Sequence, residues 1–230
     1  MAEEIVSGTS GVEIEVLHGS YDVPGARLLD LVTVMDKLRV HCPWDREQTH
    51  RSLARYLLEE AYETLEAIDT GDDTHLREEL GDLLLQVYFH ARIAAEREPD
   101  GFTIDDVAEG IIAKLVHRHP HVFAGVEVAD VGEVEANWET LKHAEKGRSS
   151  VLEGIPRALP ALALADKVLG RATRVGVTAS DVEPAETPSS LGARLLALVV
   201  EARAAGLDPE QELRDAVRRL ADAVRAAEIP

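Results

Sequence analysis

The strongest constraint on this chain is a pair of long helical segments that are separated by only four polar residues. Hydrophobic residues recur at helical spacing across residues 52–69 and again across residues 74–97, with the polar break at residues 70–73 between them. Asp72 or Asp73 is suited to cap the second helix. We therefore expect the two helices to fold back on each other as an antiparallel hairpin.

The rest of the chain also shows helical patterns, so the expected fold class is all-α. Thr103, with Asp106 three residues later, has the pattern of a capping box. Residues 12–16 alternate as a short strand would, although a disordered leader is the favoured alternative there. The expected helices cover residues 28–38, 52–69, 74–97, 103–119, 133–146 and 158–174, and two segments between residues 191 and 228.

We divide the chain into four parts from its composition and an internal likeness. Residues 178–190 are rich in Pro, Ser, Thr and acid, as linkers are. Residues 191–196 resemble residues 80–85 over six positions, which is a weak repeat that chance could also produce. In the second copy the acids Glu78, Glu79 and Asp82 are replaced by Ser189, Ser190 and Ala193. The expected parts are a leader (1–24), a catalytic domain (25–177), the linker (178–190) and a degenerate helical repeat without metal-binding acids (191–230).

The charge balance excludes some classes of protein. There are 24 Lys and Arg residues against 43 Asp and Glu, which gives a net charge of −19. Such a chain lacks the basic surface that binds nucleic acid polymers, but its carboxylates suit hard cations. Its single cysteine, Cys42, excludes an intrachain disulfide and a cysteine-built zinc site. No apolar run is long enough to span a membrane, and the start does not resemble a secretory signal, so we expect a cytoplasmic protein.

Four acidic residues meet across the expected hairpin. Glu60 and Glu63 lie three residues apart on the first helix, and Glu79 and Asp82 lie three apart on the second, at matching distances from the break. Helical phase places Glu60 and Glu79 on the apolar stripes and the other two at the edges. Any one of these acids could be an ordinary solvated side chain. Four that converge would repel one another, and protonation or a hard cation such as Mg²⁺ would relieve that repulsion.

Phosphate chemistry around such an ion also needs positive charge from the protein. Lys114 and Arg118 lie four residues apart on one helix face, although such a pair is often only solvated. Trp138 lies one turn before Lys142 and suits either a core position or stacking on a base. The pattern does not favour zinc at the histidines near Pro120, and His90 is expected to lie in the core or beside the metal ligands.

Taken together, these motifs resemble the MazG family over roughly residues 25–178. The likeness is carried by Cys42-Pro43-Trp44-Asp45, Gln48-Thr49-His50, Glu59-Glu60-x-x-Glu63, Glu79-x-x-Asp82 and the run from Lys114 to Phe123. It implies an all-α pyrophosphohydrolase that converts NTPs and dNTPs to monophosphates and pyrophosphate with Mg²⁺ (or Mn²⁺), and that cleanses the nucleotide pool. The residues implicated are Glu60, Glu63, Glu79 and Asp82 as metal ligands, Glu59 in an auxiliary role, and Lys114, Arg118, Trp138 and Lys142 as nucleotide contacts.

The resemblance also implies a homodimer or a higher homo-oligomer, because a helical hairpin alone cannot cover both of its apolar sides. The C-terminal repeat lacks the acids, so we expect it to be structural. The alternative from a different class is a catalytically silent helical scaffold that binds nucleotide or a partner protein.

Overall fold

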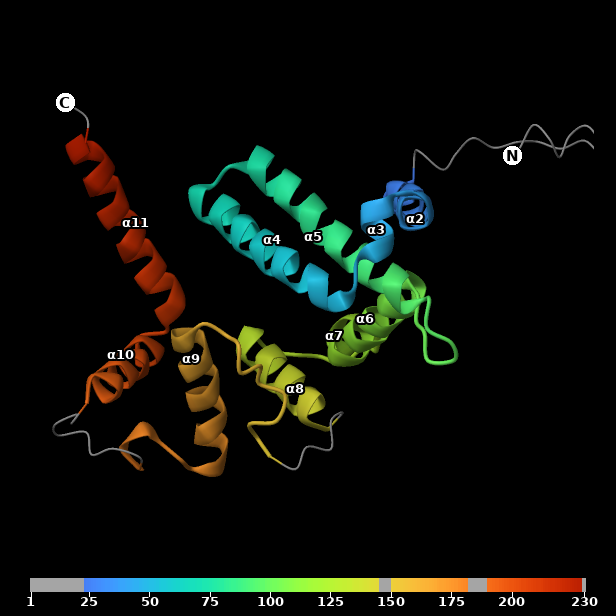
Figure 1. Cartoon of the computed structure of the whole chain (residues 1–230). Coiled ribbons are helices and arrows are strands. Elements are labelled where there is room, and N and C mark those ends of the chain that lie inside the picture. The colour runs from blue at the N-terminus through green and yellow to red at the C-terminus, as the bar shows by residue number, and fades with distance from the viewer. Residues whose placement is uncertain (1–22, 145–149, 182–189, 229–230) are drawn as a thin grey trace, which may run out of the picture. The chain divides into compact units, whose positions relative to one another are not determined.

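The computed structural model describes residues 23–144, 150–181 and 190–228 (Figure 1). Every regular element in these ranges is a helix, as the sequence predicts. Residues 12–16, for which a disordered leader was favoured over a short strand, lie outside them. The chain forms two compact units, of which the first ends at Val128 and the second begins at Ala129. Residues 182–189 of the expected linker lie outside the described residues, and the division into a catalytic domain and a repeat stays a prediction.

The first unit is built on the expected hairpin of α4 (His50–Thr70) and α5 (Asp73–Ala94). Gly71 ends α4 with φ of 70°, a left-handed conformation that a side chain would disfavour. Asp72 then accepts hydrogen bonds from the backbone N–H groups of Thr74 and His75 and so begins α5. These caps reverse the chain within three residues, which fixes how the two helices align.

The far end of α5 differs from the prediction. The helix ends at Ala94 rather than near residue 97. The backbone N–H of Glu96 bonds to Ile93 O at 3.2 Å, and that of Arg97 bonds to Ala94 O at 3.1 Å. These bonds reach back three residues instead of four, so the last turn tightens and the helix stops.

The hydrophobic core of this unit lies against the end of the hairpin that is farther from the turn. Helices α2 (Ala26–His41) and α6 (Ile104–Arg118) both pack on α5. Leu58, near the middle of α4, and Leu80, in the turn half of α5, are exposed at 60% and 51%. The fully buried cluster consists of Met35, Leu53, Tyr88, Phe89 and Ile93.

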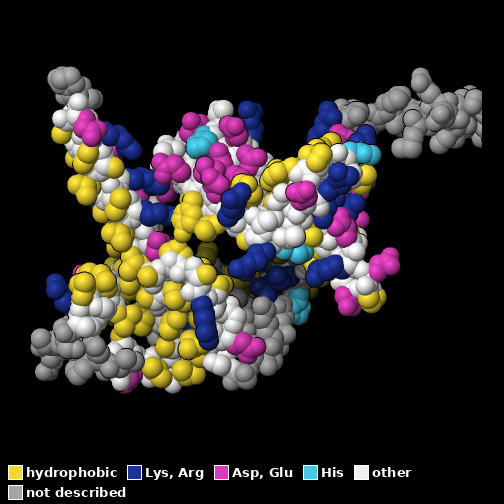
Figure 2. Space-filling model, in the orientation of Figure 1, with side chains coloured by type: hydrophobic (Ala, Val, Ile, Leu, Met, Phe, Trp, Pro, Cys, Tyr) yellow, Lys and Arg dark blue, Asp and Glu magenta, His cyan; other side chains and the backbone are white. Residues whose placement is uncertain are grey.

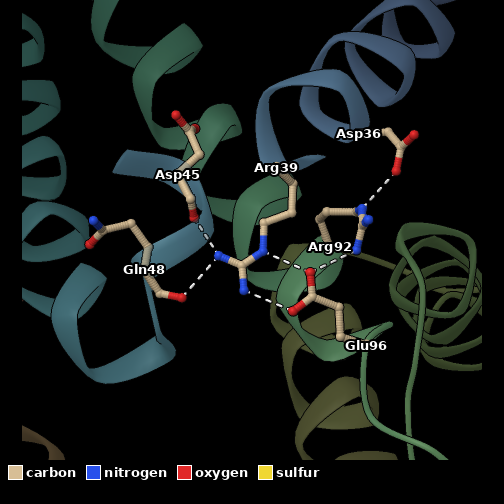
Figure 3. A network of polar contacts seen from close by, with 6 residues as sticks. All are labelled: Asp36, Arg39, Asp45, Gln48, Arg92 and Glu96. Carbon is tan, nitrogen blue, oxygen red and sulfur yellow. Dashed lines mark hydrogen bonds and ion pairs between the residues drawn. The ribbon is translucent and has the colours of Figure 1, made fainter. Parts of the chain in front are cut away.

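A polar network joins α2, the short helix α3 (Pro43–Glu47) and the chain beyond α5 (Figure 3). The guanidinium of Arg39 bonds both carboxylate oxygens of Glu96, at 2.7 and 2.8 Å. It also donates to the backbone carbonyls of Asp45 and Gln48. Arg92 links Glu96 to Asp36 of α2. The network holds the turn that leads into α4 against the end of α5.

Two further expectations about helix ends are confirmed. Thr103 and Asp106 form the predicted capping box at the start of α6. Helix α2 ends at His41, directly before Cys42 and Pro43, as the proline requires. The short helix α7 (Pro120–Phe123) follows α6.

The second unit packs α9 (Ala161–Ala172) against α10 (Leu191–Ala204) and α11 (Pro209–Glu228). It also contains α8 (Val131–Ala144) and two short 3₁₀ turns, η2 (Thr173–Val175) and η3 (Ala179–Asp181). Residues 80–85 lie inside α5, whereas residues 191–196 begin α10. Ser190 caps α10 by accepting a hydrogen bond from the Ala193 N–H at 3.1 Å. Ser190, which aligns with Glu79, therefore acts as a helix N-cap in this unit. The repeat itself stays a prediction.

Candidate metal centre

Three acidic side chains from the two helices of the hairpin converge on one point. Glu60 of α4 and Glu79 and Asp82 of α5 each offer a carboxylate oxygen, and these oxygens all lie within 4.8 Å of one another. Figure 2 shows acidic side chains gathered over the turn end of the hairpin. The sequence predicted that these acids meet, because they lie at matching distances from the turn at which α4 ends and α5 begins.

The other two acids of the first motif lie at the margin. Glu63 is exposed and is not one of the three converging residues, although its negative charge adds to those that raise the pKa of Glu60. Glu59 is exposed, as its helical phase predicts.

The cluster is electrostatically unfavourable as it stands. Burial raises the pKa of Glu60, and the negative charges of Asp82, Glu63 and Glu79 raise the pKa further. No positive charge is among the groups that shift the pKa of Glu60 within the described part of the chain. A cation at this point would relieve the repulsion that otherwise favours protonation.

Glu79 provides a second observation that points to a cation. The residue is only 7% exposed, and its Oε1 lies 3.0 Å from Nε2 of His75, one turn earlier on α5. Its other oxygen, Oε2, is buried and has no hydrogen-bond partner among the described residues. An unpaired buried carboxylate oxygen is costly, and a hard cation satisfies it. His75 was not predicted, although its spacing of four residues from Glu79 was a usable signal.

The expected nucleotide contacts fall in both units. Lys114 is exposed on α6, and Arg118, four residues later, is buried at 6% exposure. Trp138 and Lys142 belong to α8 in the second unit, and the side chain of Lys142 lies outside the described residues. The nucleotide contacts of all four residues stay predictions.

Two groups of aromatic and histidine side chains lie near the end of the hairpin that is farther from the turn. His50 begins α4 and faces His90 of α5, with their Nδ1 atoms 2.8 Å apart and their rings stacked. Trp44 is half exposed and meets Tyr56 and Phe89 edge-on, with ring centroids 6.1 and 6.3 Å away. Trp44 therefore packs at the rim of the core with one side open to solvent.

Comparisons with known proteins show a family to which this chain is similar. Residues 48–123 match the model of the MazG nucleotide pyrophosphohydrolase domain, a range that holds the acids, Lys114 and Arg118 but not Trp138 or Lys142. The nucleoside triphosphate pyrophosphohydrolase/pyrophosphatase MazG of Thermotoga maritima is 40% identical over 86% of this chain and 84% of that protein. An uncharacterized 26.1 kDa protein of Streptomyces cacaoi is 52% identical over 94% of this chain and 88% of that protein.

A longer relative is similar over most of this chain. The nucleoside triphosphate pyrophosphohydrolase of Mycolicibacterium smegmatis is 46% identical over 89% of this chain. This chain spans 60% of that relative's length. No helix among the described residues is long and apolar enough to cross a membrane.

Proposed function

Since the chain belongs to the MazG family, we propose that it is a Mg²⁺-dependent nucleoside triphosphate pyrophosphohydrolase. It converts NTPs and dNTPs to monophosphates and pyrophosphate. The observations that carry the proposal are the convergence of Glu60, Glu79 and Asp82 and the buried, unpaired Oε2 of Glu79. A phosphate-cleaving enzyme needs a cation at such a point, whereas a silent scaffold has no use for it.

The three converging acids would hold the ion, and Glu63 would complete the set from beside Glu60. Mg²⁺ suits these oxygen ligands, and Mn²⁺ accepts the same ones. When bound, it would offset the charge of the phosphates and lower the pKa of the water that attacks the α-phosphorus. His75 orients Glu79 through the contact to its Oε1.

The remaining residues would bind the substrate. Lys114 and Arg118 would neutralise the triphosphate from α6, and Lys142 would add to them. Trp138 would stack on the base. Glu59 would orient a cationic side chain or a water molecule from the outer face of α4.

The wider role is also a proposal. The reaction removes damaged or excess nucleotides from the pool, and it would take place in the cytoplasm, where nucleoside triphosphates are made and used. Exposed Leu58 and Leu80 leave apolar surface on the hairpin. A second copy of the chain would cover that surface, so we propose a homodimer.

Replacing Glu79 with Gln tests the mechanism. We expect Glu79→Gln to lose at least about 100-fold in the release of pyrophosphate from dNTPs with Mg²⁺, because the ion loses a charged ligand and several kcal/mol of charge stabilisation. Circular dichroism should show unchanged helix content. Glu109→Gln, at an exposed position on α6, is the matched control and should keep full activity. If Glu79→Gln stays active, these acids are not part of the mechanism. If the wild-type chain releases no pyrophosphate, the catalytically silent scaffold is favoured instead.

A further inference from the structure

The polar face of α5 extends beyond the proposed metal ligands. Glu79, Asp82, Gln86 and His90 follow one another at helical spacing on one side of the helix. Gln86 is only 5% exposed, yet its Oε1 is buried and has no hydrogen-bond partner in the described residues. Nε2 of His90 is also buried and has no hydrogen-bond partner in the described residues. We call Gln86, His90 and His50 the polar seam of the hairpin.

His50 and His90 close the seam at the end away from the turn. With their Nδ1 atoms 2.8 Å apart, one ring donates and the other accepts. That contact uses Nδ1 of His90 and leaves its Nε2 for another partner. Burial lowers the pKa of His90, and the charge of His50 lowers it further, so the ring is neutral near pH 7 and can donate or accept.

Buried polar atoms in folded proteins nearly always have a partner. Here unpaired buried atoms recur on the same face of α5, from the acid cluster to the histidine pair. This repetition suggests one elongated polar ligand. A buried water molecule could satisfy any single one of these atoms, and the experiment below separates that case.

The spacing fits a nucleotide. An α-helix rises about 1.5 Å per residue, so Gln86 lies roughly 6 Å and His90 roughly 12 Å beyond Asp82 along α5. In a nucleotide the sugar and then the base follow the α-phosphate over a distance of the same order. A nucleotide with its phosphates at the acids would therefore bring its nucleoside alongside the seam.

We propose that Gln86 and His90, with His50 supporting the histidine ring, form the nucleoside subsite of this enzyme. The unpaired oxygen of Gln86 accepts a hydrogen bond from an N–H of the base or an O–H of the sugar, and Nε2 of His90 binds the next polar group. The assignment rests on the proposed function, because the acids set where the phosphates lie. It makes the seam the place where the enzyme discriminates among nucleosides.

Gln86→Leu tests the subsite, because it keeps the volume and removes the polar groups. The readout is the dissociation constant with Mg²⁺ for α,β-imido analogues of dATP, dCTP, dGTP, dTTP and ATP, which resist cleavage at the bond in question. The matched control is Tyr88→Phe, which removes a buried hydroxyl of the same helix that bonds to Leu28 O. His90→Phe keeps the ring stacked on His50 and removes Nε2, so it tests the same subsite if Gln86→Leu does not fold.

We expect Gln86→Leu to change the ratio of affinities between bases by about tenfold or more, because a site built around a hydrogen bond rejects a ligand that cannot make it. If the sugar is the partner, the ratio between ATP and dATP analogues changes instead. Tyr88→Phe should leave every ratio within about twofold.

The subsite is refuted if Gln86→Leu or a folded His90→Phe weakens all analogues equally or not at all, as a water-filled or merely structural seam would. The subsite is also refuted if the wild-type chain binds no analogue. A wild-type chain that binds the analogues but releases no pyrophosphate from dNTPs would refute the proposed function, while the affinity ratios would still decide the subsite.

Discussion

Arg39 is expected to be the most important polar side chain for the stability of the first unit. Its side chain is only 10% exposed, and its guanidinium bonds Glu96 and the carbonyls of Asp45 and Gln48 (Figure 3). Arg39→Met keeps much of the buried aliphatic length and removes every one of these bonds. The change therefore isolates the polar contribution from the packing contribution.

The expected loss follows from the surroundings of each partner. Glu96 is 40% exposed and keeps Arg92, so losing this ion pair should cost about 0–1 kcal/mol. The two carbonyls are partly buried and lose their charged donor, at about 1–3 kcal/mol each. We expect a total near 3 kcal/mol, since the contributions are not fully additive. For a chain of this length that corresponds to a fall in Tm of about 6–12 °C.

Urea unfolding followed by Trp44 fluorescence measures this loss. A Trp138→Phe background makes Trp44 the only tryptophan, so the signal comes from the first unit alone. Arg27→Met is the matched control, because Arg27 pairs with Asp30 where both side chains are largely exposed, at 74% and 51%. The control should change the free energy of unfolding by less than about 0.5 kcal/mol. If Arg39→Met loses no more than the control, the network of Figure 3 does not stabilise the unit.

Two further predictions concern the hairpin. In Mg²⁺-free buffer, Glu60→Gln should stabilise the protein above the ordinary glutamate pKa. A carboxyl with a raised pKa in the folded state binds more protons when folded, so the wild type loses stability as pH rises from the unfolded value through the folded one. Denaturation midpoints across that range should diverge with rising pH, and parallel curves would contradict the raised pKa. Leu53→Ala removes a core side chain that is 1% exposed and should cost about 2–5 kcal/mol of unfolding free energy, whereas Leu58→Ala, at a position 60% exposed, should cost far less. Equal losses in the two variants would show that the core is placed wrongly.

The hairpin and its acids could be predicted because they depend on local signals. A short polar break, a glycine and an aspartate cap fix the turn, and helical phase then places Glu60, Glu79 and Asp82 together. Helical phase also put Glu63 at the edge of the stripe, but its place outside the three converging acids was not predicted, because phase does not fix where a side chain at the edge points.

Contacts between distant parts of the chain could not be predicted in the same way. His50 and His90 are 40 residues apart, and Arg39 and Glu96 are 57 apart. Sequence patterns locate each residue on a helix, but the pairing depends on how α2, α4 and α5 pack. The unpaired oxygen of Gln86 could not be predicted for a related reason. The sequence places this glutamine in an apolar stripe but does not indicate how deeply it is buried or what it contacts.

The tight reversal at Gly71 also limits how this gene can vary in length. One residue inserted between α4 and α5 would turn every following side chain of α5 by about 100° and shift it by about 1.5 Å. Glu79 and Asp82 would then face away from Glu60. An insertion between α5 and α6 leaves that alignment intact. Among descendants of this sequence, length changes should accumulate in the segment after Ala94 and be absent from residues 70–73.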